Sequence, residues 1–284
     1  HFMDERKTNA LPGFDLYIDS KLSLPMPGCE LINPVASSAS QAPEAVLQRE
    51  LKWMQDDIDA YAAGADAPAL GNGPAVHVGI DSEWQFMPES CRNRVLSYQF
   101  HLFSPLGELA GILYPKTPDR RISFEKFLGL ILQQAMQHEV IEAWPFKAYV
   151  YGHFLRADVT HFDSFWVNKR KVDGMRGTLA SVTGDYEADW LDQGTRYRPS
   201  PLVLRDEYRH ARRTLVRFVD TLLLTPGHLG LDSAGELIGV DKLELPPGYE
   251  KSEMARLLAE RPEDFQRYAL RDAEIAVRYG LKVL

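Results

Sequence analysis

Residues 76–85 read VHVGIDSEWQ, and this stretch predicts the strand on which the fold is organised. Val76, Val78 and Ile80 alternate with His77 and Gly79. Such alternation of apolar residues is typical of a β-strand. The short and mainly apolar run therefore indicates a strand that is buried in the core of the domain.

Two acids, Asp81 and Glu83, follow that apolar run at a spacing of two. Residues i and i+2 of a strand point to the same face, so both carboxylates are expected side by side at the end of the strand. Two carboxylates that close repel each other unless one is protonated or a cation lies between them. The pair is therefore a candidate divalent-metal site, with solvated surface acids as the alternative.

The composition of the 284 residues, 45% hydrophobic and 25% charged, is that of an ordinary globular protein. A net charge of −8 argues against a surface that coats nucleic acid throughout. Two basic clusters, 168–171 and 205–217, are either phosphate-binding patches or solvated faces. No apolar run approaches the roughly 20 residues of a membrane helix, and no signal peptide opens the chain. With two distant cysteines, Cys29 and Cys91, we expect a cytoplasmic protein without membrane contact.

The remaining pattern is that of an α/β protein. Residues 94–102 and 108–114 predict two further strands in an antiparallel meander with the first. The later expected elements are, in chain order, a helix over 123–138 capped by Ser123, a fourth strand over 146–151, a helix over 158–168, a hairpin-like insertion over 199–217, a fifth strand ending at Asp220, and helices near 233–238, 251–260 and 261–284. The sequence thus predicts a mixed five-stranded sheet flanked by helices.

Residues 1–74 are expected to form an N-terminal extension of loops with one amphipathic helix over 43–63. The compact domain is expected to span 75–284. The final helix reaches the last residue without a cap, which we interpret as a sign that the chain is cut from a longer protein.

Two further features carry acids. Asp158 follows a strand and a Gly152-His153 turn, where an acid is most often a helix cap. Asp163, five residues later, is a rival for the same role. Tyr268 and Asp272 stand four apart on a predicted helix and so share one of its faces, a pairing that also arises by chance.

Together the three features supply four carboxylates from separated segments: Asp81, Glu83, Asp158 and Asp272. Hard oxygen ligands of this kind suit Mg²⁺ or Mn²⁺. Two such ions about 3.5–4 Å apart can activate the attacking water and stabilise the leaving oxygen of a phosphodiester. Tyr268 would orient that water by a hydrogen bond.

In this order the motifs resemble those of the DEDD 3′–5′ exonucleases, in the subgroup with a tyrosine in the third motif. Within that family they are most similar to the proofreading domains of family B DNA polymerases of the plasmid and protein-primed kind. The matching residues are Asp81 and Glu83 in the first motif, Gly152-His153-Phe154 and Asp158 in the second, and Tyr268 and Asp272 in the third. Residues 218–224 and 231–246 add to the likeness, which covers about 75–284. Phe154 stands where the family often has Asn.

The resemblance implies a ribonuclease H-like fold and a 3′–5′ exonuclease in which the four acids bind two divalent ions and Tyr268 is catalytic. It implies single-stranded DNA or a DNA 3′ end as the substrate, and a polymerase or other domain after residue 284 in a bacterial or mobile-element protein. Because Phe154 replaces an amide, an RNA-trimming exonuclease stays open, as does a non-catalytic nucleic-acid-binding or scaffold domain. The residues expected to contact nucleic acid are Trp84 and Phe154 by stacking, and Lys169, Arg170, Lys171, Arg209, Arg212 and Arg213 at the backbone.

Overall fold

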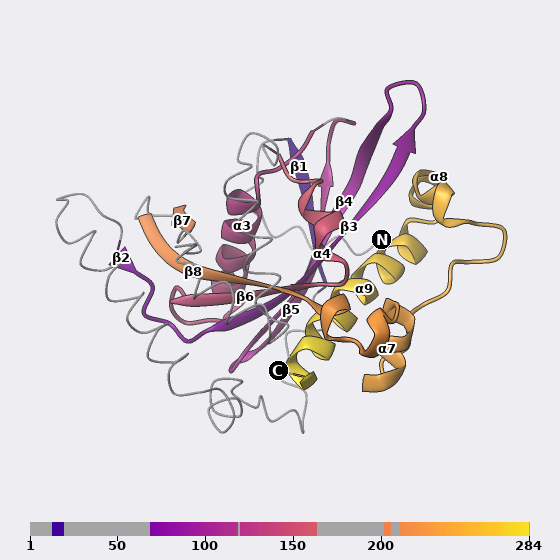
Figure 1. Ribbon diagram of the computed structural model, residues 1–284. Coiled ribbons are helices and arrows are strands. Elements are labelled where there is room, and N and C mark those ends of the chain that lie inside the picture. The colour runs from indigo at the N-terminus through magenta and orange to yellow at the C-terminus, as the bar shows by residue number, and fades with distance from the viewer. Residues whose placement is uncertain (1–12, 20–68, 119, 164–201, 206–210, 284) are drawn as a thin grey trace, which may run out of the picture.

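The computed structural model of the protein describes residues 13–19, 69–118, 120–163, 202–205 and 211–283 (Figure 1). These residues form a mixed β-sheet in the order β1-β5-β4-β3-β6-β8-β2, with β7 paired to β8. Helices lie on both faces of the sheet (Figure 1). The expected α/β class, a mixed sheet flanked by helices that is consistent with a ribonuclease H-like fold, is confirmed. The described part holds eight strands, however, and not five.

The expected meander is formed by β3 (Val76–Met87), β4 (Arg92–Ser104) and β5 (Gly107–Pro115), all antiparallel. β3 is longer than the sequence predicted because it stays paired with β4 as far as Met87. Asp81 and Glu83 therefore lie in the middle of this strand and not at its end.

Two parallel strands continue the sheet beside β3. β6 (Lys147–Gly152) pairs with the first residues of β3, and its last pair there is Gly79 with Tyr151. β8 (Ala211–Asp220) pairs with β6 and ends at Asp220, as expected. Because β6 stops while β3 continues, one edge of β3 is open next to the two acids.

The segment before residue 75, expected to hold only loops and a helix, contributes two strands. β1 (Phe14–Asp19) pairs with β5, and β2 (Ala69–Leu70) pairs with β8. In β1, Phe14, Leu16 and Ile18 pack against the core. The strand therefore shows the alternation of apolar residues typical of a strand, but over only six residues. The helix expected over 43–63 lies outside the described residues.

The hairpin-like insertion corresponds to β7 (Leu202–Arg205), which pairs antiparallel with the first half of β8. The second run of the expected insertion and the expected fifth strand therefore form one strand, β8. The segment between β7 and β8 is not among the described residues.

Two helices enclose the sheet. α3 (Phe124–Gln137) begins at Ser123, whose hydroxyl accepts a hydrogen bond from the Lys126 amide as an N-cap, and it packs on the face that carries Val78 and Ile80. α9 (Pro262–Val283) packs on the opposite face, which carries Asp81. The two acids of β3 thus face α9.

The helix expected over 158–168 is instead α4 (Leu155–Val159), and residues 164–168 lie outside the described range. Phe154 precedes the helix in the left-handed conformation, with φ of 64°. At the C-terminal end, the hydroxyl of Thr160 donates a hydrogen bond of 2.6 Å to the carbonyl of Ala157. Asp158 is therefore the fourth residue of a short helix and not its cap.

The other described helices follow β8. They are η2 (Thr221–Leu224), η3 (Pro226–His228), α7 (Leu231–Ile238), η4 (Lys251–Glu253) and α8 (Met254–Glu260). None of the helices in the described ranges is long and apolar enough to cross a membrane.

Candidate active site

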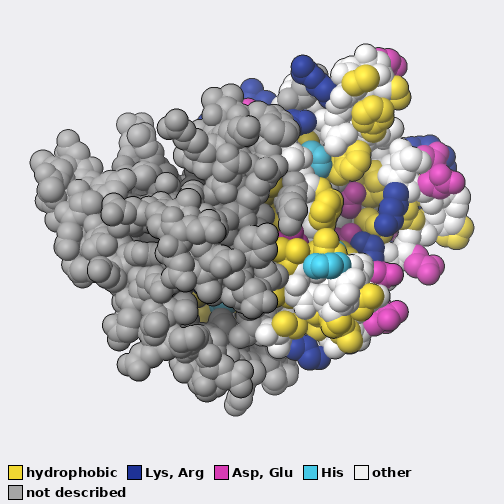
Figure 2. Space-filling model, viewed as in Figure 1, with side chains coloured by type: hydrophobic (Ala, Val, Ile, Leu, Met, Phe, Trp, Pro, Cys, Tyr) yellow, Lys and Arg dark blue, Asp and Glu magenta, His cyan; other side chains and the backbone are white. Residues whose placement is uncertain are grey.

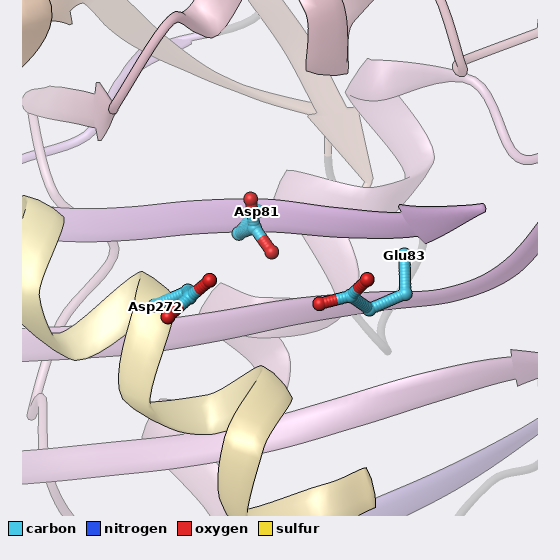
Figure 3. Close-up of side chains that lie close together, drawn as sticks. All are labelled: Asp81, Glu83 and Asp272. Carbon is cyan, nitrogen blue, oxygen red and sulfur yellow. The ribbon is translucent and has the colours of Figure 1, made fainter. Parts of the chain in front are cut away.

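Three carboxylates from two elements meet above the sheet. Asp81 and Glu83 on β3 and Asp272 on α9 each offer an oxygen, and these oxygens all lie within 4.8 Å of one another (Figure 3). Figure 3 shows the three side chains directed toward a common point between the strand and the helix. The sequence placed all three in one site, and the structure brings them together.

A close contact between backbones allows this approach. A Cβ atom on Gly79 would overlap the carbonyl oxygen of Ala273, so only glycine lets α9 lie this near to β3. Asp272 directly precedes Ala273 in the chain. The contact at Gly79, two residues before Asp81, therefore places the Asp272 carboxylate over β3 near Asp81. The register between β3 and β4 then shifts after Glu83, and such bulges re-aim the side chains next to them.

A buried amide orients the first acid. Gln99 lies opposite Asp81 on β4, and its Nε2 donates a hydrogen bond of 2.5 Å to Oδ2 of Asp81. Ser97 in turn donates to Oε1 of Gln99 at 3.1 Å. Both Ser97 and Gln99 are fully buried, so this chain of hydrogen bonds holds the carboxylate in one orientation.

Burial raises the pKa values of all three carboxylates, and neighbouring carboxylates add to the rise at Asp81 and Glu83. Burial, followed by the charge of Asp272, raises the pKa of Asp81 to about 7. Burial and the charge of Asp81 likewise raise the pKa of Glu83 well above its usual value. Burial also raises the pKa of Asp272. Full ionisation of these buried acids is therefore costly without a counter-charge, which a bound cation would supply.

One cation from the protein already faces these acids. The ammonium of Lys242 forms an ion pair with Oδ2 of Asp272, and it lies 5.0 Å from the centre of the Tyr268 ring. Its charge opposes the rise in pKa at Asp81, Glu83 and Asp272. Lys242 is therefore a component of the site.

The residues fit a metal ion. Within the described part of the chain, Oδ1 of Asp272 is buried and has no hydrogen-bond partner, which is costly for a carboxylate oxygen. The donors are all carboxylate oxygens, which hard divalent cations prefer. The cluster could thus bind metal through Asp81, Glu83 and Asp272.

Asp158, the fourth expected ligand, lies beside this cluster without joining it. Its Oδ1 accepts hydrogen bonds from the backbone amide of Ser82 at 3.1 Å and from the Ser82 hydroxyl at 2.7 Å. Asp158 thus occupies the open edge of β3 between the two acids. Burial and the nearby charge of Asp81 raise its pKa well above the usual value, so the four groups are electrostatically one site. Asp163, the rival, is exposed.

Tyr268 lies one helical turn before Asp272 on α9 and is buried. Burial, followed by the nearby carboxylates, raises the pKa of its hydroxyl above the usual value. The hydroxyl therefore stays protonated near neutral pH and can donate a hydrogen bond.

The expected nucleic-acid contacts have different outcomes. Trp84 and Phe154 are 39% and 51% exposed. Trp84 follows Glu83 on β3, and Phe154 lies in the turn before α4, the helix that carries Asp158. Lys169, Arg170, Lys171 and Arg209 lie outside the described residues. Arg212 and Arg213 lie near the start of β8. At the usual rise per residue, the backbone of β8 extends about 25 Å from Arg212 to its last residue, Asp220.

On the face seen in Figure 2, acidic side chains lie among hydrophobic and basic ones, over the region between α4 and α9 in Figure 1. Hydrophobic side chains thus adjoin the acids on the described surface.

The sequence did not assign site roles to Lys242, Gln99 or Ser82. Lys242 belongs to a stretch quoted for its likeness to polymerases, and Ser82 stands between the two acids, so each had a weak signal. Gln99 belongs to β4, which also carries Ser97 and His101, so nothing in the sequence distinguished it from the other polar residues of that strand.

Two comparisons bear on this site. No protein-family model matches the chain. The chain is similar to the primer-independent DNA polymerase PolB of Escherichia coli, with 34% identity over 260 residues. The match covers 89% of this chain but 30% of that protein, so the chain spans less than a third of its relative's length. The similarity therefore relates the chain to a segment of a DNA polymerase.

The raised pKa of Asp81 predicts a pH-dependent stability for the metal-free protein. A carboxyl whose folded pKa lies above its unfolded pKa stabilises the fold below about pH 4, and this contribution is lost as the pH rises through about 7. Asp81→Asn has no such loss, so in EDTA its melting temperature should exceed that of the wild type by a margin that grows from pH 4 to pH 8. Thermal unfolding over that range measures the margin; a constant margin would contradict the prediction.

Proposed function

We propose that this chain is a metal-dependent 3′–5′ exonuclease domain of the tyrosine-containing DEDD type, acting on single-stranded DNA as the proofreading part of a DNA polymerase. One observation carries the proposal: Asp81, Glu83 and Asp272 converge above the sheet, with Asp158 and Tyr268 beside them. The similarity to a DNA polymerase supports it.

The residues of this chain would divide the work. Asp81, Glu83 and Asp272 would hold Mg²⁺ or Mn²⁺, with Asp158 as a further ligand. A bound pair of these ions supplies an activated water and charge stabilisation at the leaving oxygen. The Tyr268 hydroxyl, kept protonated by its surroundings, would donate a hydrogen bond that orients the attacking water.

The substrate end would reach these acids along an exposed aromatic surface. Trp84 follows Glu83 on β3, and Phe154 precedes α4, which carries Asp158. Aromatic side chains stack on unpaired bases of any identity, a mode suited to a nuclease that accepts every sequence. An unpaired 3′ end is therefore the substrate that this surface favours.

The proposal predicts stepwise shortening of a single-stranded oligonucleotide from its 3′ end. With a 5′-fluorescent DNA and Mg²⁺ or Mn²⁺, a denaturing gel should show a ladder of shorter products and released nucleoside 5′-monophosphate. EDTA should stop the reaction, and a phosphorothioate at the 3′-terminal linkage should slow it.

The double variant Asp81→Ala with Glu83→Ala is the matched control, and it should lose activity by about 10³-fold or more, because it lacks both β3 ligands. Undiminished digestion by that variant would refute the proposed site. Intact DNA with the wild type under all metal conditions would favour a non-catalytic domain. The same oligonucleotide as RNA decides between DNA and RNA as the substrate.

A further inference from the structure

A chain of buried and partly buried hydrogen bonds runs from Asp158 to Asn93 near the start of β4. The hydroxyl of Ser82 donates to Oδ1 of Asp158 at 2.7 Å, and the same Oγ lies 2.8 Å from Nδ1 of His161. At the other side of the ring, Nε2 of His161 lies 3.3 Å from Nδ2 of Asn93. Ser82, Asp158 and His161 are each at most 5% exposed.

The chemistry of these groups fixes the direction of each hydrogen bond. The Ser82 hydroxyl has one proton, which the Asp158 carboxylate accepts, so Oγ can only accept from His161. Nδ1 of His161 must then carry the ring proton. The Nδ2 group of Asn93 can only donate, so Nε2 of His161 accepts from it and the ring is neutral. Every donor thus points toward Asp158.

The surrounding structure holds the ends of this chain. Arg121 donates to the carbonyl of Thr160 and to the carbonyl of Asn93, both at 2.9 Å, and so ties the two backbones together. The Tyr98 hydroxyl donates to the carbonyl of His161 at 2.8 Å. The imidazole therefore has little freedom to turn away from Ser82.

We propose that Ser82 and His161 are positioning residues that orient the Asp158 carboxylate toward the metal site; the proposal rests on the function proposed above. Both hydrogen bonds from Ser82 end on Oδ1, so Oδ2 lies outside this pair and is the oxygen available to a cation. Groups that hydrogen-bond to a ligating carboxylate fix its orientation, and their loss typically weakens metal binding by about 10–100-fold.

The test compares variants that differ in single donors. Ser82→Ala should weaken Mn²⁺ binding, measured by electron paramagnetic resonance, by about 10–100-fold, while Ser82→Thr keeps a hydroxyl and should stay within about threefold. His161→Asn keeps an amide donor near the place of Nδ1 and should bind Mn²⁺ better than His161→Gln, whose amide replaces Nε2. A cooperative thermal unfolding transition is the control that each variant is folded.

A spectroscopic test needs no activity. In ¹⁵N-histidine-labelled wild type, the ring nitrogen shifts of His161, assigned by their absence in His161→Asn, should report a proton on Nδ1. A proton on Nε2 would reverse the chain and overturn the proposal. So would Mn²⁺ binding by Ser82→Ala at the wild-type affinity, or equal affinities of the two His161 variants.

The experiment separates this proposal from the proposed function. If the wild type digests DNA and Ser82→Ala binds Mn²⁺ and digests DNA equally well, the positioning role alone is overturned. If Mn²⁺ binding depends on Ser82 as expected but no DNA is cleaved, the positioning role is supported and the exonuclease function fails.

Discussion

Asp158→Asn is expected to lower the rate of metal-dependent DNA cleavage by about 10³-fold, whereas Asp163→Asn should change it by less than about threefold. The two acids are five residues apart, and the sequence favoured Asp158 over Asp163 as the acid of the second motif. Asp158 is 5% exposed and held by Ser82 beside the other acids, while Asp163 is exposed. We therefore expect Asp158, and not Asp163, to contribute to binding a cation between β3 and α9.

The loss has an electrostatic origin. A carboxylate ligand that becomes an amide loses its negative charge while keeping its size, and metal clamps stabilise the transition state by several kcal/mol. Because burial and the charges of Asp81 and Glu83 raise the pKa of Asp158, Asp158→Asn should leave the metal-free fold as stable as the wild type or more so. Steady-state cleavage rates in saturating Mn²⁺, with melting temperatures in EDTA, measure both effects. Equal rates for the two variants would show that Asp158 is not a ligand.

Local periodicity predicted the parts of the site that lie on regular elements. The i, i+2 rule placed Asp81 and Glu83 on one face of a strand, and the i, i+4 rule placed Tyr268 and Asp272 on one face of a helix. That α9 meets β3 closely enough to join the two pairs depends on Gly79, whose missing side chain admits the Ala273 carbonyl. Sequence spacing contains no such information about two elements far apart in the chain.

Irregular segments account for most of what the sequence did not predict. The position of Asp158 depends on the left-handed turn at Phe154, which is tied by its amide to Oδ1 of Asp220 at 3.0 Å. A residue other than glycine rarely adopts that conformation, so a longer helix starting at Asp158 was the natural prediction. Lys242 and Asp272 are 30 residues apart, and Lys242 lies in a segment outside the helices and strands. No rule of periodicity predicts their contact.

Lys242→Met is expected to destabilise the metal-free protein more than a change at any exposed lysine. The Lys242 side chain is 17% exposed and pairs with the side chain of Asp272, which is 9% exposed and is one of the three clustered carboxylates. Removing one partner of a buried ion pair costs about 3–5 kcal/mol, because the remaining charge stays uncompensated. In a domain of this size that corresponds to a drop in melting temperature of about 10 °C.

The drop should depend on both pH and metal, since its cause is the unbalanced charge of the acids. Protonation relieves the repulsion, so in EDTA Lys242→Met should lose more stability at pH 8 than at pH 5, and Mn²⁺ should raise its melting temperature by more than that of the wild type. Lys251→Met is the matched control, because Lys251 is exposed and its charge also acts on Glu83 and Asp272. It should shift the melting temperature by no more than about 2 °C. Equal melting temperatures of Lys242→Met and the wild type at pH 8 in EDTA would mean that the ammonium does not balance these acids, and that another charge does.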